Sequence, residues 1–90
     1  MFDKNYQKLD ELEFSGQIDG IELNGENGFI TSQNEDAIIY FKLLNNKLEI
    51  IKKIYGFNFP HGISSLNNKI VVTNYGDNSI DILNISDLIY

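Results

Sequence analysis

An internal repeat with a period of 42 residues limits the folds open to this chain. Moving the sequence along itself by that distance places residues 18–41 on residues 60–83 without a gap. Four positions are then identical, and many others keep their polar or apolar character: Gly20/Gly62, Ile21/Ile63, Thr31/Thr73 and Ile38/Ile80. A repeat of this length indicates a supersecondary unit that buries its apolar faces by stacking on a copy of itself.

Within each copy of the repeat the segments are short and typical of β-strands. Strands are expected at residues 20–23, 28–32, 37–43 and 47–54 in the first copy, and at 62–66, 69–74 and 79–83 in the second. Their Ile, Val and Thr content suits a pleated sheet, and the asparagines between them suit tight turns. Residues 7–13 have helical propensity. We nevertheless expect a strand there, because this segment precedes Gly20 much as residues 47–54 precede Gly62.

Four strands in about 42 residues is the size of one β-propeller blade. The segments Phe59–Ile63, Val71–Gly76 and Asn78–Ile82 resemble the repeat of six- and seven-bladed propellers of the YVTN and NHL-like kind. The first copy departs from that pattern, with Ile18 in place of Pro60 and Asp19 in place of His61. The resemblance implies an all-β fold of two four-stranded antiparallel blades. It does not imply one function, because that group includes lyases, lactonases, binding proteins and scaffolds.

The position of the repeat within the chain predicts how the blades are completed. Residues 1–90 are expected to form one propeller segment, with an outer closing strand at 5–14, one blade at 18–54 and a second at 59–90 that lacks its outer strand. Residues 87–90 fall where that strand should begin. An open sheet edge invites pairing, so the expected partner is another copy of the chain or other propeller blades. The alternatives are a piece of a longer product and a non-functional gene fragment.

Composition excludes several classes of protein. The net charge is −6, with 13 acidic residues against 7 basic ones, and all the basic residues are lysines. An acidic chain without arginine argues against binding to nucleic acids or to anionic membranes. No apolar run approaches the roughly 18 residues of a membrane-spanning helix, and no signal peptide is visible, so a cytoplasmic location is expected. Cysteine is absent, which excludes disulfides and thiolate metal sites.

His61 is the only histidine and the first candidate for a binding site. In propellers with this repeat, the segment that contains it lies near the central channel. A symmetric trimer would gather three His61 side chains and three Asp19 carboxylates around the axis, and such a ring could bind a divalent cation such as zinc. The alternative is that His61 caps a turn or donates one hydrogen bond to the backbone.

Two further residues are candidates for ligand binding. Tyr75, with neighbouring aromatic side chains, could line a face that binds a sugar or a peptide, or it could pack between blades. Asp77 could bind a cation through its oxygens, or it could satisfy the backbone of a turn. With a single histidine there is little from which to build a catalytic triad.

The sequence therefore predicts a non-catalytic binding or interaction module of β-propeller type. The alternative is a metal-assisted enzyme of lyase or lactonase type, formed on an assembled ring with His61 and Asp19 at the channel. Neither the ligand nor a cofactor follows from the sequence.

Overall fold

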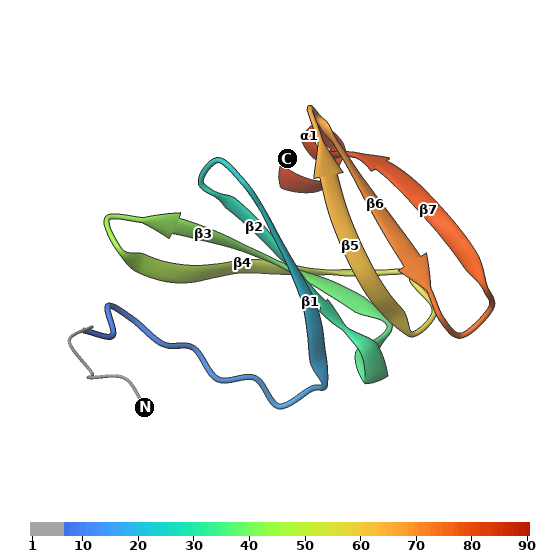
Figure 1. The fold of residues 1–90 in the computed structure, drawn as a ribbon, viewed down its shortest axis with the longest axis horizontal. Helices are drawn as coiled ribbons and strands as arrows, with labels where there is room; N and C mark the ends of the chain where they lie inside the picture. Colours follow the sequence, from blue (N-terminus) through green and yellow to red (C-terminus); the bar gives the residue numbers. More distant parts are fainter. Residues whose placement is uncertain (1–6) are drawn as a thin grey trace, which may run out of the picture.

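In the computed structural model, which describes residues 7–90, the chain forms two antiparallel sheets followed by a short helix (Figure 1). Sheet A contains, in spatial order, β1 (Ile18–Asn24), β2 (Asn27–Ser32), β3 (Ala37–Leu44) and β4 (Lys47–Tyr55). Sheet B contains β5 (Pro60–Leu66), β6 (Lys69–Asn74) and β7 (Ser79–Asn84). A single 3-10 turn, η1 (Gln33–Glu35), joins β2 to β3, and α1 (Ile85–Ile89) follows β7. The predicted all-β class is confirmed.

Asparagine and glycine set the tight turns that join successive strands. Asn45 and Asn46, between β3 and β4, both have positive φ, at 50° and 63°. This is the backbone of a two-residue hairpin turn whose twist matches that of the flanking strands. Gly25, Asn67 and Asn78 take the same left-handed conformation in other turns. These residues tolerate positive φ better than β-branched ones, so the local sequence is enough to fix where the strands end.

Sheets A and B pack face to face, with their first strands β1 and β5 beside each other (Figure 1). Both sheets, the β4–β5 loop and α1 contribute to the core between them, whose buried members are Phe29, Ile38, Tyr40, Phe57, Ile70, Val72, Ile85 and Leu88. Phe29 and Tyr40 stack with ring centroids 5.4 Å apart. Burial raises the pKa of the Tyr40 phenol, whose hydroxyl donates to Asn27 Oδ1 at 2.6 Å. The core therefore depends on contacts between the sheets.

The strand register assigns each residue to the inner face of its sheet, toward the other sheet, or to its outer face. Directly paired residues of antiparallel strands point to the same side. Ile38 pairs with Thr31 on the inner face of sheet A and is fully buried. Ile80 pairs with Thr73 in the corresponding position of sheet B, yet it is 64% exposed on the outer face. The two positions thus share a register, but Ile38 faces the core between the sheets and Ile80 faces away from it.

The expected outer strand at residues 5–14 is not seen as a strand. Residues 5 and 6 lie outside the described part, and residues 7–14 form neither helix nor strand. Instead, Phe14 packs on the outer face of sheet A, against a cluster formed by Ile30, Ile39 and Phe41. The backbone N–H of Leu48 donates to Asp10 Oδ2 at 2.8 Å. Pairing of this segment with the blade of another chain stays a prediction.

The expected start of a strand at residues 87–90 is wrong, because α1 occupies residues 85–89. Ile85 and Leu88 stand three positions apart, so they lie on one face of the helix and are buried in the core. The Ile85 N–H also donates to the Asn68 carbonyl oxygen at 2.8 Å, which ties the start of the helix to the β5–β6 turn. Among residues 7–90, no helix is long and apolar enough to cross a membrane.

The hydrogen bond from Leu48 to Asp10 gives a first testable prediction. This bond, followed by one from the Glu11 N–H, lowers the pKa of Asp10. The bond is therefore present above the ordinary carboxyl pKa and is lost as the pH falls through the lowered value. We expect Asp10→Ala to reduce the hydrogen-exchange protection of the Leu48 amide at neutral pH, measured by NMR and corrected for intrinsic rates. Unchanged protection would contradict this attachment of the N-terminal segment.

Candidate functional site

His61, Asp19 and Gln33 meet near the start of β1 and β5, the first strands of the two sheets. His61 Nδ1 lies 2.7 Å from Asp19 Oδ2, and the two side chains are 60% and 40% exposed. Gln33 Nε2 lies 2.9 Å from the same ring nitrogen and 3.4 Å from Asp19 Oδ2. A proton on Nδ1 lets the ring donate to the carboxylate; Nδ1 then cannot accept from the Gln33 amide, whose acceptor is Asp19 Oδ2. In this arrangement Nε2 of His61 has no hydrogen-bond partner among residues 7–90.

Backbone contacts between the two sheets position His61 beside Asp19. The hydroxyl of Thr31 accepts a hydrogen bond from the Gly20 N–H at 2.8 Å and donates to the His61 carbonyl oxygen at 3.0 Å. A Cβ atom at Gly20 would lie only 2.9 Å from that carbonyl oxygen. Gly20 therefore allows β1 and β5 to approach, and Thr31 joins them. The site is held by the packing of the sheets.

The η1 turn positions Gln33, which the sequence did not indicate as a site residue. The Gln33 N–H donates to the Gln17 carbonyl oxygen at 2.8 Å. At the other end of the turn, Glu35 accepts hydrogen bonds from Lys53 Nζ at 2.8 Å and from Ser32 Oγ at 2.6 Å. These contacts lower the pKa of Glu35, and the carboxylate raises that of Lys53. Gln33 takes the position in the first copy of the repeat that the predicted site residue Tyr75 takes in the second. This correspondence was the one sequence signal that could have indicated Gln33.

Tyr75 also lies close to His61. Its ring centroid is 6.3 Å from that of His61 and 6.0 Å from that of Phe59, and the residue is 71% exposed. A shallow hollow beside His61 is lined by Thr73, Tyr75, Asn78 and other residues of the β6–β7 hairpin. The structure therefore brings three of the four predicted ligand-binding residues together: Asp19, His61 and Tyr75.

The fourth predicted residue, Asp77, is engaged in the turn between β6 and β7. Its Oδ1 accepts a hydrogen bond from Ser79 Oγ at 2.6 Å. Asp77 is not among the residues that line the hollow beside His61. Within residues 7–90, no three side chains of His, Asp or Glu are grouped closely enough to hold a metal ion. His61 and Asp19 supply two donors, so a metal bound at His61 would need more ligands than the side chains of residues 7–90 place there.

No family model matches the chain, and no curated protein matches it.

Proposed function

We propose that this chain is a non-catalytic interaction module of β-propeller type. In this proposal, sheet A is one blade and sheet B is the next blade without its outer strand. Two features support it: each sheet is an antiparallel meander in chain order, and the first strands of the two sheets lie side by side. Blades bury their faces only against neighbouring blades. The natural partners are therefore further blades, from another copy or from another chain.

The ligand site that we propose lies at the start of β1 and β5. The observation that carries it is the His61 imidazole, which Asp19 holds through Nδ1 while Nε2 stays free and the side chain is largely exposed. Gln33 adds an amide and Tyr75 adds a phenol and an aromatic face. Such a set suits a small polar molecule that hydrogen-bonds to several groups at once. Among the described residues, the imidazole nitrogen Nδ1 contacts a carboxylate and an amide, groups suited to holding a polar ligand in place.

The second candidate function is a metal-assisted enzyme on an assembled ring. The observation that favours it is the contact of His61 Nδ1 with the Asp19 carboxylate. Metal-binding histidines commonly donate their second ring N–H to a carboxylate, which orients the first nitrogen toward the metal. In this alternative, Nε2 of His61 would bind the metal, which would act as a Lewis acid on a substrate carbonyl.

The two candidates can be tested with NMR titrations of isotope-labelled protein by D-glucose, glycylglycine and Zn²⁺. For an interaction module we expect at least one organic probe to shift the signals of Asp19, Gln33, His61 and Tyr75, and we expect His61→Ala to abolish those shifts. Shifts elsewhere, or no shift with either organic probe, would contradict the proposed site. Zn²⁺ bound stoichiometrically at His61, and lost in His61→Ala, would favour the enzyme. Asp77→Ala, outside the hollow, is the matched control and should bind as the unmodified chain does.

A further inference from the structure

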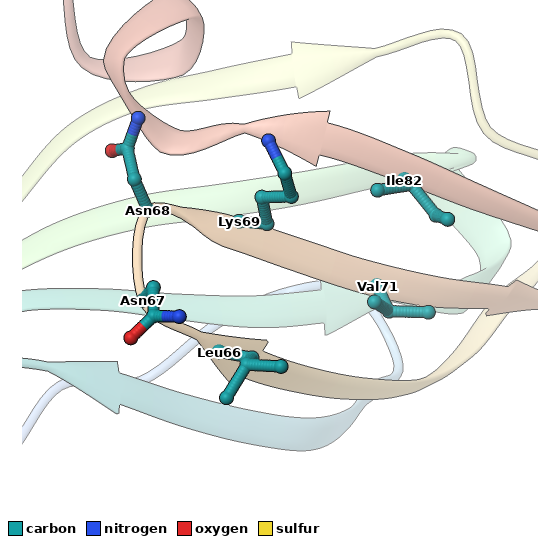
Figure 2. A pocket seen from close by; sticks show the side chains of 6 residues that line it. All are labelled: Leu66, Asn67, Asn68, Lys69, Val71 and Ile82. Carbon is teal, nitrogen blue, oxygen red and sulfur yellow. The ribbon is translucent and has the colours of Figure 1, made fainter.

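The outer face of sheet B is apolar and uncovered. It contains Leu66, Ile80 and Ile82, which are 73%, 64% and 67% exposed, together with the partly buried Val71. Figure 2 shows Leu66, Val71 and Ile82, from three successive strands, around a hollow that the Asn67-Asn68 turn closes at one end. We call this surface the outer B face. An apolar surface of this kind in a small chain indicates an interaction site.

The outer face of sheet A is also apolar. The register places Ile21, Ile30 and Ile39 in one row across the sheet, and Leu23, Gly28, Phe41 and Ile50 in the next row. Two of these residues, Ile21 and Leu23, belong to the edge strand β1 and are 58% and 50% exposed. Leu12 and Phe14 of the N-terminal segment line a hollow on this surface. We call it the outer A face.

Each outer face corresponds, residue by residue, to a face that the chain already buries. Positions 42 residues after Phe29, Ile38 and Tyr40 of the inner A face are Val71, Ile80 and Ile82 of the outer B face. Positions 42 residues before the inner-face residues Ile63, Val72 and Leu83 are Ile21, Ile30 and Phe41 of the outer A face. Each of the two faces that form the internal contact between the sheets therefore has an exposed counterpart. The counterparts are the outer B face and the outer A face.

A hydrogen-bond donor is placed to join the outer B face to a second chain. The hydroxyl of Thr31 accepts from the Gly20 N–H at 2.8 Å and donates to the His61 carbonyl oxygen of sheet B at 3.0 Å. The hydroxyl of Thr73 accepts from the Gly62 N–H at the same 2.8 Å distance, but it faces the exposed side of sheet B. The position that corresponds to His61 in the first copy of the repeat is Asp19. Each threonine hydroxyl also lies 3.5 Å from the carbonyl oxygen of its own glycine, so the bond without a counterpart at Thr73 is the one to the neighbouring sheet; its acceptor would be the Asp19 carbonyl oxygen of another chain.

Gly62 is a second indication that another chain approaches β5 closely. A Cβ at Gly20 would lie 2.9 Å from the backbone of β5, so glycine is required there by the packing of sheet B on sheet A. At Gly62, the only atom of the described residues within 4 Å of such a Cβ is the Thr73 hydroxyl oxygen, at 3.1 Å. Nor does Gly62 have a positive φ. If a strand of another chain approached β5 as closely as β5 approaches β1, glycine would be required at position 62 for the same reason as at position 20.

We infer that the outer B face of one copy docks on the outer A face of a second copy and so repeats the internal contact between sheets A and B. In the docked pair, Thr73 donates to the Asp19 carbonyl oxygen of the second copy. The contact joins two different surfaces, so the chains extend head to tail until a ring closes. Leu12 and Phe14 lie on the outer A face and have to move when the second copy docks. This inference rests on the proposal that the sheets are consecutive repeat units. Thr73 and Ile80 of sheet B also line the hollow beside His61, so ligand binding there is tested in variants that stay monomeric.

The test uses two full-length variants that each disable one face. Ile82→Lys places a charge on the outer B face, and Ile21→Lys places one on the outer A face. Both residues are largely exposed, so the variants are expected to fold, as circular dichroism would check. By sedimentation velocity, each variant alone should stay at the monomer mass of 10.3 kDa, whereas a mixture of the two should form a 1:1 dimer. The dimer forms because the intact B face of Ile21→Lys meets the intact A face of Ile82→Lys.

Several outcomes would overturn the inference. A dimer of Ile21→Lys alone would show that two B faces pair with each other. A mixture that stays monomeric while the unmodified chain associates would show that other surfaces are used. An unmodified chain that stays monomeric would refute docking altogether.

Leu44→Lys is the matched control. Leu44 is 41% exposed at the β3–β4 hairpin, away from both outer faces, so this variant should associate as the unmodified chain does. The variants Leu66→Lys and Leu23→Lys repeat the test with independent residues. Adding D-glucose and glycylglycine to the monomeric variants, with the His61 signals followed by NMR, separates a failure of docking from a failure of the ligand site.

Discussion

Ile38→Ala is expected to lower the free energy of unfolding by about 2–5 kcal/mol, the range measured when a buried isoleucine or leucine is truncated. Ile38 is fully buried between the two sheets and belongs to the core that joins them. Small domains are stable by only about 5–15 kcal/mol, so this single change would remove a large part of the stability of a 90-residue chain. Urea denaturation followed by circular dichroism measures the loss.

Ile80→Ala is the matched control, because Ile80 has the same residue type and the corresponding position in the repeat. It is 64% exposed, so in the monomer its truncation should change the free energy of unfolding by no more than about 0.5 kcal/mol. In the associated chain Ile80 takes the buried role that Ile38 has inside the molecule, and the same change should weaken association. Equal losses of monomer stability for the two variants would contradict the assignment of these residues to inner and outer faces.

Gly20→Ala is the second change with a large expected effect. The added Cβ would meet the His61 carbonyl oxygen at 2.9 Å, and because that oxygen belongs to the backbone of β5, the two strands must separate. Added atoms at a tightly packed position typically cost about 1–3 kcal/mol. We expect a loss of this size in urea denaturation, together with changed NMR signals for His61 and Thr31, whose contacts depend on the same approach.

Gly62→Ala provides the comparison. Its Cβ would have one neighbour within 4 Å, the Thr73 hydroxyl oxygen, which a side-chain rotation can move. The monomer should therefore lose less stability than with Gly20→Ala, while docking of a second copy on β5 should be blocked. A Gly62→Ala variant that associates as strongly as the unmodified chain would argue against the close approach that we infer.

The strands were predictable because their signals are local. The segment at residues 69–74 is rich in β-branched residues, and an Asn-Asn turn precedes it, so strand and turn follow from neighbouring residues alone. The meeting of Asp19 and His61 was predictable too, because they occupy the same position in the two copies of the repeat. The expectation required three chains around an axis, whereas the structure joins the two residues within one chain.

The features that the sequence did not predict depend on contacts between distant residues. Residues 85–89 form a helix because Ile85 and Leu88 find room in the core between the sheets, which no local pattern reveals. The N-terminal segment follows sheet A because Asp10 accepts a hydrogen bond from Leu48, 38 residues away. Gln33 reaches His61 because η1 is held by Glu35 and its partners. Each outcome is decided by tertiary packing, which overrides short-range propensity.

The central claim is that the chain is a pair of repeat units with one complementary face open at each end. The measurement that tests it most directly is the sedimentation velocity of the unmodified chain over a series of increasing concentrations. We predict that the average mass rises from the 10.3 kDa of one chain to beyond that of two, since head-to-tail contacts do not stop at a dimer. A folded protein that keeps the mass of a single chain at every concentration would contradict the claim.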